Sequence, residues 1–187
     1  MGFTRAELES YRGASIPDLM PTEPRLVFVG INPGLWTAAT GTPFAHPGNR
    51  FYPALVAAGI LPRLPVFTTA LSDDDREMIF AAGIGITNLV ARATARADEL
   101  SIDELRDGGR ALEERLAIIR PTAVAVVGIT AYRQAFSRPK ARTGEQDERL
   151  AGCRTWVLPN PSGLNAHDTI ATLATAYAEP ARAAGIL

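Results

Sequence analysis

The sequence predicts an α/β fold in which a parallel sheet lies between helices. Two observations predict it. Short apolar runs rich in β-branched residues recur along the chain, and the first three are almost continuously hydrophobic, as is typical of strands covered on both faces. Segments with helical start and stop signals separate these runs, and such alternation of strands and helices is typical of a parallel sheet with helices on both faces.

Four apolar runs are the predicted strands, namely 25–32 (RLVFVGIN), 83–90 (GIGITNLV), 122–129 (TAVAVVGI) and 154–161 (RTWVLPNP). The first predicted helix, 47–59, ends at a glycine and is interrupted by Pro53, because proline removes a backbone donor. The second, 72–83, begins with Ser72 as an N-cap, carries acids in its first turn and ends at Gly83.

The two later helices also have recognisable boundaries. The third predicted helix, 101–121, begins with a capping box of Ser101 and Glu104 and stops before a proline. The fourth, 167–185, is amphipathic and is predicted to break near Pro180.

Length and composition bound the class of protein. With 187 residues the chain is most simply one domain, here an N-terminal segment, 1–24, followed by a domain, 25–187. The segment is charged and lacks an apolar signal core, no stretch is apolar enough to span a bilayer, and Cys153 is the only cysteine. We therefore expect a cytoplasmic protein with no disulfide and no membrane partner. Two histidines and one cysteine cannot build a structural zinc site, so no metal is expected.

Charge is distributed unevenly along the chain. The formal net charge is −1, whereas nucleic-acid-binding proteins usually carry a basic excess. Basic residues without acids occupy 115–144, acids gather at 73–77, and 137–152 is predicted to be a polar loop. We interpret both charged runs as solvated surface rather than as a phosphate-binding face.

Two polar loops are predicted at one edge of the sheet, where the carboxyl ends of parallel strands meet and where ligands bind in such folds. The first strand leads into Asn32-Pro33-Gly34, and the last leads into 159–165 (PNPSGLN). In both loops an asparagine precedes a proline, which favours extended geometry, and a later glycine permits a tight turn with an exposed amide. Each loop alone is better explained as a simple turn, but their pairing at equivalent strand ends weakens that explanation.

Four blocks together resemble one protein family. They are GINPG at 30–34, TGTPFAHPGNRFY at 40–52, GITNLV at 85–90 and PNPSGLN at 159–165, in the family's order and at compatible spacing. By these blocks nearly the whole chain resembles the mismatch-specific uracil-DNA glycosylases, the bacterial relatives of thymine-DNA glycosylase. The resemblance implies a three-layer α/β/α sandwich with a central, mainly parallel sheet of four to five strands. It also implies a base-excision repair enzyme that flips uracil out of double-stranded DNA at mismatches with guanine and hydrolyses its glycosidic bond.

The resemblance assigns roles to residues of the first three blocks. Asn32 matches the residue that orients the attacking water, and because a neutral amide can hold water but cannot take its proton, we expect slow chemistry. Phe44 falls where the family stacks a ring on the flipped base, and backbone groups of Ile31 and Phe44 would meet the base carbonyls. Gly34 and Asn88 complete the implied base-binding set.

The fourth block supplies the implied DNA-contacting loop. Leu164 is the expected wedge that fills the hole left by the flipped base, on a turn made flexible by Gly163. Asn160 and Ser162 belong to the same loop, and Ser162 with neighbouring backbone amides is expected to hold a phosphate. Asn165 stands where an arginine is common in the family, which is expected to loosen contact with the opposite strand.

Other residues of these blocks have less definite roles. We expect His46 to hold its loop by a hydrogen bond rather than to act as an acid or base. Asn49 and Arg50 either anchor a loop or contact phosphate. The chain departs from the family at Trp36, which would narrow the pocket mouth, and at Asn88, where bacterial members often have lysine.

Several base preferences and two further classes of function stay open. The bases are uracil, thymine opposite guanine, ethenocytosine and the deaminated purines hypoxanthine and xanthine. The other classes are a nucleotide or nucleoside hydrolase and a non-catalytic lesion-binding protein. The sequence has no Walker or Rossmann glycine motif, so no cofactor is expected. Lys140, the only lysine, lies in the polar loop, so we expect the base to be released without Schiff-base chemistry or strand cleavage. We also expect a monomer.

Overall fold

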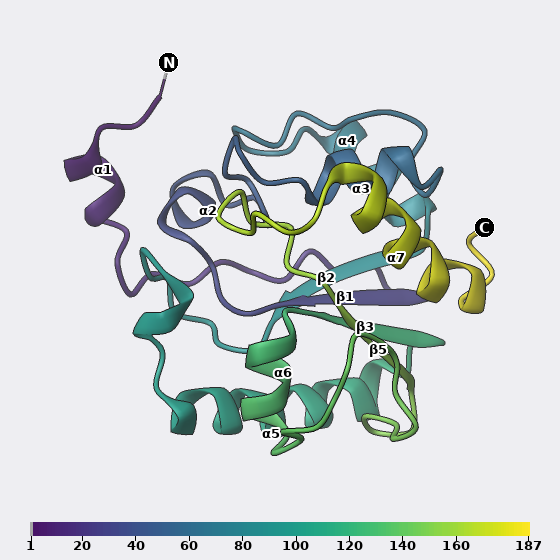
Figure 1. The fold of residues 1–187 in the computed structure, drawn as a ribbon. Coiled ribbons are helices and arrows are strands. Elements are labelled where there is room, and N and C mark those ends of the chain that lie inside the picture. The colour runs from purple at the N-terminus through teal and green to yellow at the C-terminus, as the bar shows by residue number, and fades with distance from the viewer. Residues whose placement is uncertain (1) are drawn as a thin grey trace.

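A five-stranded sheet forms the centre of the molecule (Figure 1). This computed structural model describes residues 2–187. Four strands run parallel, namely β1 (Leu26–Gly30), β2 (Ile84–Asn88), β3 (Ala123–Val127) and β5 (Arg154–Leu158), and the short β4 (Gly144–Glu145) pairs antiparallel with β5. The strand order β2-β1-β3-β5-β4 confirms the predicted mainly parallel sheet.

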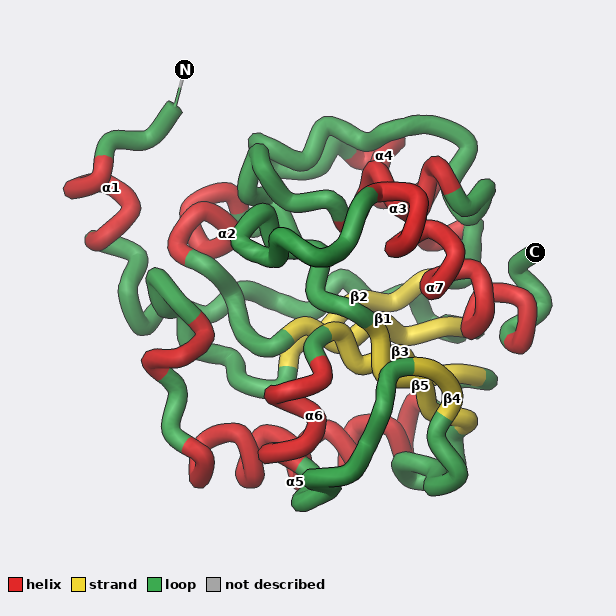
Figure 2. The backbone as a smooth tube through the Cα atoms, viewed as in Figure 1, coloured by secondary structure: helices red, strands yellow, loops and turns green. Residues whose placement is uncertain are grey.

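Helices cover both faces of this sheet (Figure 2). One face carries α3 (Phe51–Ala57), α4 (Asp73–Ala81) and α7 (Ile170–Ala183), and the other carries α5 (Ile102–Ile119) and α6 (Ile129–Ala135). Because successive strand residues point to opposite faces, Leu26 and Phe28 of β1 join the first core, whereas Val27 and Val29 join the second. This burial on both faces accounts for the continuous hydrophobicity of the strands and confirms the three-layer fold.

The predicted helix interruptions at two prolines are wrong. Pro53 is the third residue of α3, within the first turn, where backbone N–H groups have no intrahelical acceptor and proline costs no hydrogen bond. Helix α7 continues through Pro180, which is buried, and the carbonyl of Pro180 still accepts from the N–H of Ala184 at 2.9 Å. Packing of α7 on the core therefore outweighs the loss of one helical hydrogen bond.

Several short elements lie outside the sequence predictions. They are α1 (Arg5–Glu9), α2 (Leu35–Thr40), the 3₁₀ turn η1 (Ala97–Glu99), α6, and β4 within the predicted polar loop. None of them exceeds seven residues, which is two helical turns, so no periodic pattern distinguishes them from loop.

The N-terminal segment packs against the sheet and the loop that follows β2. Leu19 is buried and exchanges backbone hydrogen bonds with Ile86 at 3.0 and 2.7 Å. Further along, the N–H of Gly13 donates to the carbonyl of Ala93 at 2.9 Å. The division of the chain after residue 24 stays a prediction. Within residues 2–187 no helix is both long enough and apolar enough to cross a membrane.

Helix α5 begins at the predicted capping box, in which Ser101 and Glu104 bond each other's backbone N–H groups. Glu104 also accepts hydrogen bonds from Arg92, and these together with the cap lower the pKa of its carboxyl group from 4.5 to about 2. Because the folded-state pKa lies below that of the unfolded chain, the ionised carboxylate stabilises the fold at neutral pH. This contribution is lost as the pH falls from about 4.5 through about 2.

Replacing Glu104 by glutamine is therefore expected to make the fold less sensitive to acid. The urea midpoint of Glu104→Gln should lie below that of the wild type at neutral pH, and the two should converge as the pH approaches the lowered pKa. Glu114→Gln, on an exposed position of the same helix, is the matched control and should track the wild type. A constant difference at every pH would contradict the assignment.

Candidate functional site

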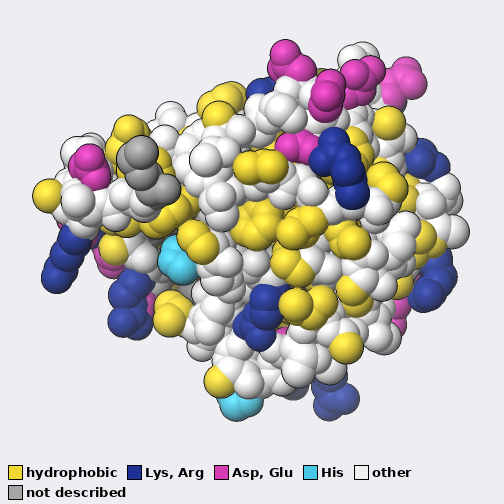
Figure 3. Space-filling model, turned by 90° about the horizontal axis from the view of Figure 1, so that it is seen from above, with side chains coloured by type: hydrophobic (Ala, Val, Ile, Leu, Met, Phe, Trp, Pro, Cys, Tyr) yellow, Lys and Arg dark blue, Asp and Glu magenta, His cyan; other side chains and the backbone are white. Residues whose placement is uncertain are grey.

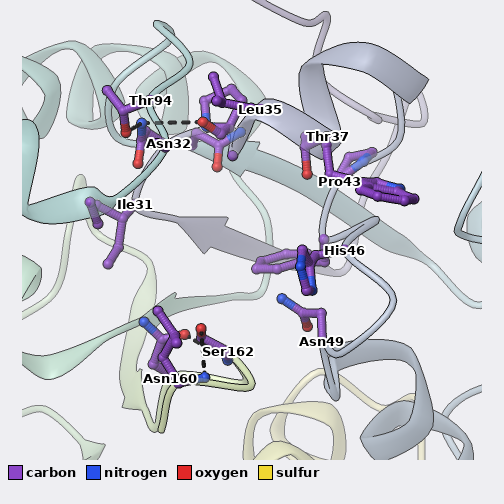
Figure 4. Close-up of a pocket in the computed structure, with 18 of the residues that line it drawn as sticks. Ile31, Asn32, Leu35, Thr37, Pro43, His46, Asn49, Thr94, Asn160 and Ser162 are labelled. Atoms are coloured by element: carbon purple, nitrogen blue, oxygen red, sulfur yellow. Dashed lines mark hydrogen bonds between the residues drawn. The ribbon is translucent and has the colours of Figure 1, made fainter. Parts of the chain in front are cut away.

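A cavity of about 470 Å³ opens at the carboxyl ends of the parallel strands (Figure 4). The loops after β1, β2 and β5 all contribute to its walls, because parallel strands end at one edge of the sheet. The predicted site residues that line it are Ile31, Asn32, Gly34, Phe44, Asn88, Asn160, Ser162, Gly163 and Leu164. Asn165 does not line the cavity; its side chain bonds the carbonyl of Asn160 within its own loop.

Asn32 is held in one orientation by the loop that follows β2. Its Nδ2 donates to the carbonyl of Arg92 at 2.9 Å, to Oγ1 of Thr94 at 2.7 Å and to the adjacent carbonyl of Pro33 at 3.2 Å. Carbonyl oxygens only accept, so these partners require the nitrogen on that side and direct Oδ1 away from it. Asn32 therefore offers the cavity a fixed acceptor that can bind water but cannot take a proton (Figure 4).

Thr94 is a site residue that the sequence interpretation missed. It accepts from Asn32, donates its own proton to the carbonyl of Arg96 at 2.8 Å and lines the cavity. Its hydroxyl is therefore committed as an acceptor toward Asn32, which removes any ambiguity about the amide orientation. The only sequence signal was its place in the loop after the predicted strand 83–90.

The base-binding residues meet around Gly30. A Cβ at this position would lie 2.5 Å from Oδ1 of Asn88 and 3.3 Å from the ring of Phe44, so only glycine lets both approach. Phe44 has a positive φ of 57° and stacks on Phe51, with ring centroids 4.0 Å apart. The carbonyl of Ile31 accepts from Val90 at 2.9 Å, so the backbone group that Ile31 can offer a ligand is its N–H.

The backbone conformation of Gly34 differs from the tight turn that the sequence predicts. It is the N-cap of α2 with φ −74° and ψ 163°, an ordinary extended conformation, so the predicted tight turn at this residue is wrong. A Cβ on Gly34 would meet no protein atom within 4 Å, and the residue lines the cavity. Its missing side chain therefore leaves room in the cavity instead of permitting a backbone turn.

Aromatic rings form one side of the cavity mouth. Trp36 lies between Phe3, at 5.1 Å between ring centroids, and His46, at 5.9 Å, and both contacts are edge-to-face. Nδ1 of His46 accepts from the N–H of Gly48 at 3.0 Å, which confirms that this side chain bonds its own loop. The contacts on either side hold Trp36 in place at the mouth.

Arg50 anchors a loop, which decides between its two predicted roles. Its guanidinium donates to the carbonyls of Ser162 at 2.6 Å, Asn165 at 2.7 Å and Asp168. The flexibility predicted for this loop at Gly163 stays a prediction, and the structure adds a second reason for glycine there, because a Cβ would lie 2.9 Å from the carbonyl oxygen of Gly48. Gly163 permits close packing of two loops.

Asn49 caps the start of α3, where its Oδ1 accepts from the N–H of Phe51 at 2.9 Å.

The cavity is nearly free of charge. Of the described residues that line it, His46 is the only one with an ionisable side chain. The basic residues of the run 115–144 do not form one continuous basic surface at the cavity. Arg115 donates to the carbonyl of Asn88, the last residue of β2, at 2.9 Å, and Arg138 forms an ion pair with Glu148. On the face of the molecule that Figure 3 shows, basic side chains are scattered and acidic side chains gather at one edge. Within residues 2–187 no three His, Cys, Asp or Glu side chains gather as a metal site.

One acid of the run 73–77 does not lie on the solvated surface predicted for it. Asp75 is buried, pairs with Arg63 and accepts from the N–H of Val66 at 3.1 Å. These bonds, together with one from Ser72, outweigh the effect of burial and lower the pKa of its carboxyl group. Asp75 therefore ties the loop before α4 to that helix.

Comparison with known proteins places this geometry in a family. The family model of the Uracil DNA glycosylase superfamily matches residues 17–179. The fold also matches the solution NMR structure of a candidate uracil DNA glycosylase from Methanosarcina acetivorans, with a TM-score of 0.62 and 16% sequence identity over 92% of this chain and 98% of that chain. The structural likeness shows a shared α/β fold, and the family match covers the strands and loops that build the cavity. The chain belongs to the Uracil DNA glycosylase superfamily.

Proposed function

We propose that this protein is a monofunctional DNA glycosylase that removes uracil mispaired with guanine from double-stranded DNA and leaves an abasic site. Superfamily membership supports DNA glycosylase activity and DNA as the substrate. The observation that carries the proposal is Asn32, whose amide nitrogen is fully engaged and whose oxygen is left for a water in a cavity large enough to admit a base. We further propose that the protein acts as a cytoplasmic monomer, without a cofactor.

Hydrolysis at this site needs a placed water more than a strong base. As the bond between base and sugar lengthens, positive charge develops on the sugar and negative charge on the base, so the electrophile is already activated. Oδ1 of Asn32 accepts a hydrogen bond from the water and aims its oxygen at C1′, which lowers the entropic part of the barrier. We propose that the backbone N–H of Ile31 donates to a carbonyl of the departing base, which is supported by the engagement of the Ile31 carbonyl with Val90 and by the place of Ile31 in the cavity wall.

Asn88 supports a preference for uracil. Its amide has one acceptor and two donors, which complement the N3–H donor and O4 acceptor of uracil. Gly30 brings this amide next to the ring of Phe44, on which the base would stack. Thymine has the same hydrogen-bonding edge and carries an additional methyl group at C5, and Trp36 at the cavity mouth favours the smaller base.

A panel of duplexes tests the proposal. Excess protein is incubated with duplexes that carry U·G, T·G, U·A, ethenocytosine·G or hypoxanthine·T, and alkali-labile abasic sites are scored. We expect U·G to be cut fastest and no strand breakage before alkali. Absence of cleavage in every duplex would exclude a glycosylase. Lesion-selective binding alone would then favour a binding protein, and cleavage of free deoxyuridine alone would favour a nucleoside hydrolase.

Leu164 is the proposed wedge, and its truncation should weaken duplex cleavage. The side chain is 87% exposed at a loop tip beside the cavity, where it can replace a base in the stack. We expect Leu164→Ala to lower the single-turnover rate on a U·G duplex roughly tenfold, or ~1.4 kcal/mol. Ile118→Ala is the matched control, because Ile118 is 83% exposed on α5, away from the cavity. Equal rates for Leu164→Ala and wild type would exclude the wedge.

A further inference from the structure

Arg50 anchors the loop that carries Leu164 through hydrogen bonds to the backbone of that loop. We define residues 159–168 as the wedge loop. The backbone N–H of Arg50 donates to the carbonyl of Pro161 at 3.0 Å, and its guanidinium donates to three more carbonyls, those of Ser162, Asn165 and Asp168. One residue thus engages four carbonyls of the wedge loop, including those on both sides of Leu164.

Helix α7 contributes two further bonds, from the hydroxyl of Tyr177 to the carbonyl of Pro159 at 3.1 Å and from that of Thr172 to the carboxylate of Asp168 at 3.3 Å, and the other bonds of the wedge loop are internal. The side chain of Asn165 donates to the carbonyl of Asn160 at 2.9 Å, and Oγ of Ser162 accepts from the N–H of Leu164 at 3.3 Å. Gly163 rests against the carbonyl of Gly48. The backbone around Leu164 is therefore bonded on several sides, while its side chain stands in solvent.

We propose that Arg50 is a positioning residue that presets Leu164 for insertion into the DNA stack, acting through the backbone of the wedge loop and without contacting DNA. This inference rests on the proposed function. Ordering a loop during binding costs conformational entropy, and a loop that is already ordered avoids that cost. Because its Nη atoms bond the loop carbonyls and its Nε is buried, the guanidinium is not presented to a phosphate.

Lysine cannot replace Arg50 in this role. The guanidinium is a planar fork whose separate N–H groups reach carbonyls at different points of the loop, whereas a lysine ammonium is a single point. Arg50→Lys therefore keeps the charge and removes the geometry. Arg25→Lys is the matched control, because Arg25 donates to the carbonyls of Gly185 at 2.5 Å and Ala82 at 3.3 Å, just before β1 at the opposite end of the sheet.

A double-mutant cycle of Arg50→Lys and Leu164→Ala tests the inference. Each variant is measured for affinity to a G-containing duplex with a tetrahydrofuran abasic analogue, relative to undamaged duplex, and for single-turnover cleavage of U·G. If Arg50 acts through Leu164, each single change weakens both readouts about tenfold and the double change is no weaker than Leu164→Ala alone. Arg25→Lys should match the wild type in both.

Multiplying effects would overturn the inference: a loss of roughly a hundredfold in the double variant means that Arg50 acts independently of Leu164. Gly163→Ala is the second variant in case Arg50→Lys folds poorly. It lifts the wedge loop from Gly48 without changing Arg50, and it should couple to Leu164→Ala in the same way. The affinity readout does not depend on catalysis. Failure of wild type to release uracil therefore counts against the proposed function, and independence in the cycle counts against Arg50.

Discussion

Asn32→Ala is expected to lower the single-turnover rate of uracil release from a U·G duplex by at least about a hundredfold, since it removes the group that places the water. The variant should bind an abasic-analogue duplex as tightly as wild type and remain folded at the assay temperature, although loss of the amide hydrogen bonds to Arg92 and Thr94 should lower its melting temperature. Four of the five asparagines of the chain line the cavity and the fifth, Asn165, lies in the wedge loop, so duplex binding and the retained fold serve as the controls in place of a remote asparagine. An unchanged rate would remove Asn32 from the mechanism.

Asn32→Asp tests whether a stronger base at position 32 speeds uracil release or whether the neighbouring carbonyl oxygens prevent this. A carboxylate is the stronger base, yet its second oxygen would face the carbonyls of Arg92 and Pro33 where the wild-type amide donates hydrogen bonds. Oxygen facing oxygen raises the free energy of the ionised side chain. We therefore expect this variant to be slower than wild type at neutral pH. A faster rate would show that the loop rearranges to accept a carboxylate.

Gly108→Ala should cause a large loss of stability. Gly108 lies in α5, and a Cβ there would come within 2.4 Å of the carbonyl oxygen of Leu89, a backbone atom that no rotamer change can move away. Overpacking of this kind costs about 1–3 kcal/mol or more, against a gain of about 1 kcal/mol in helix propensity. We expect a net loss of ~2 kcal/mol, seen as a fall in the melting temperature of roughly 4–8 °C.

The same change should also slow catalysis by the protein that remains folded. Leu89 begins the loop that presents Arg92 and Thr94 to Asn32, so displacing its carbonyl disturbs the amide that holds the water. Glu113→Ala, at an exposed position on the same helix, is the matched control and should change stability by less than about 0.5 kcal/mol. A melting temperature equal to that of wild type would contradict the close contact at Gly108.

Much of the fold could be predicted because its signals are local. Apolar runs covered on both faces, Ser72 as an N-cap and the Ser101–Glu104 capping box depend on residues within a few positions of each other, and the structure contains all of them. The predicted breaks at Pro53 and Pro180 failed because proline is disfavoured only where its N–H is needed or packing does not compensate.

The sequence by itself determined the layered fold and which polar residues follow the strands, because the pattern of apolar residues and the order of the segments can both be seen directly in the sequence. Only the tertiary structure decided what these residues can do. Asn32 is oriented by Thr94, 62 residues away, and the wedge loop is held by Arg50 across separations of 112 and 115 residues. The partners in both cases are largely backbone carbonyls, which every residue carries. The residue type does not show whether its backbone carbonyl will accept a particular hydrogen bond, so that use is known only when folding brings the carbonyl to a donor.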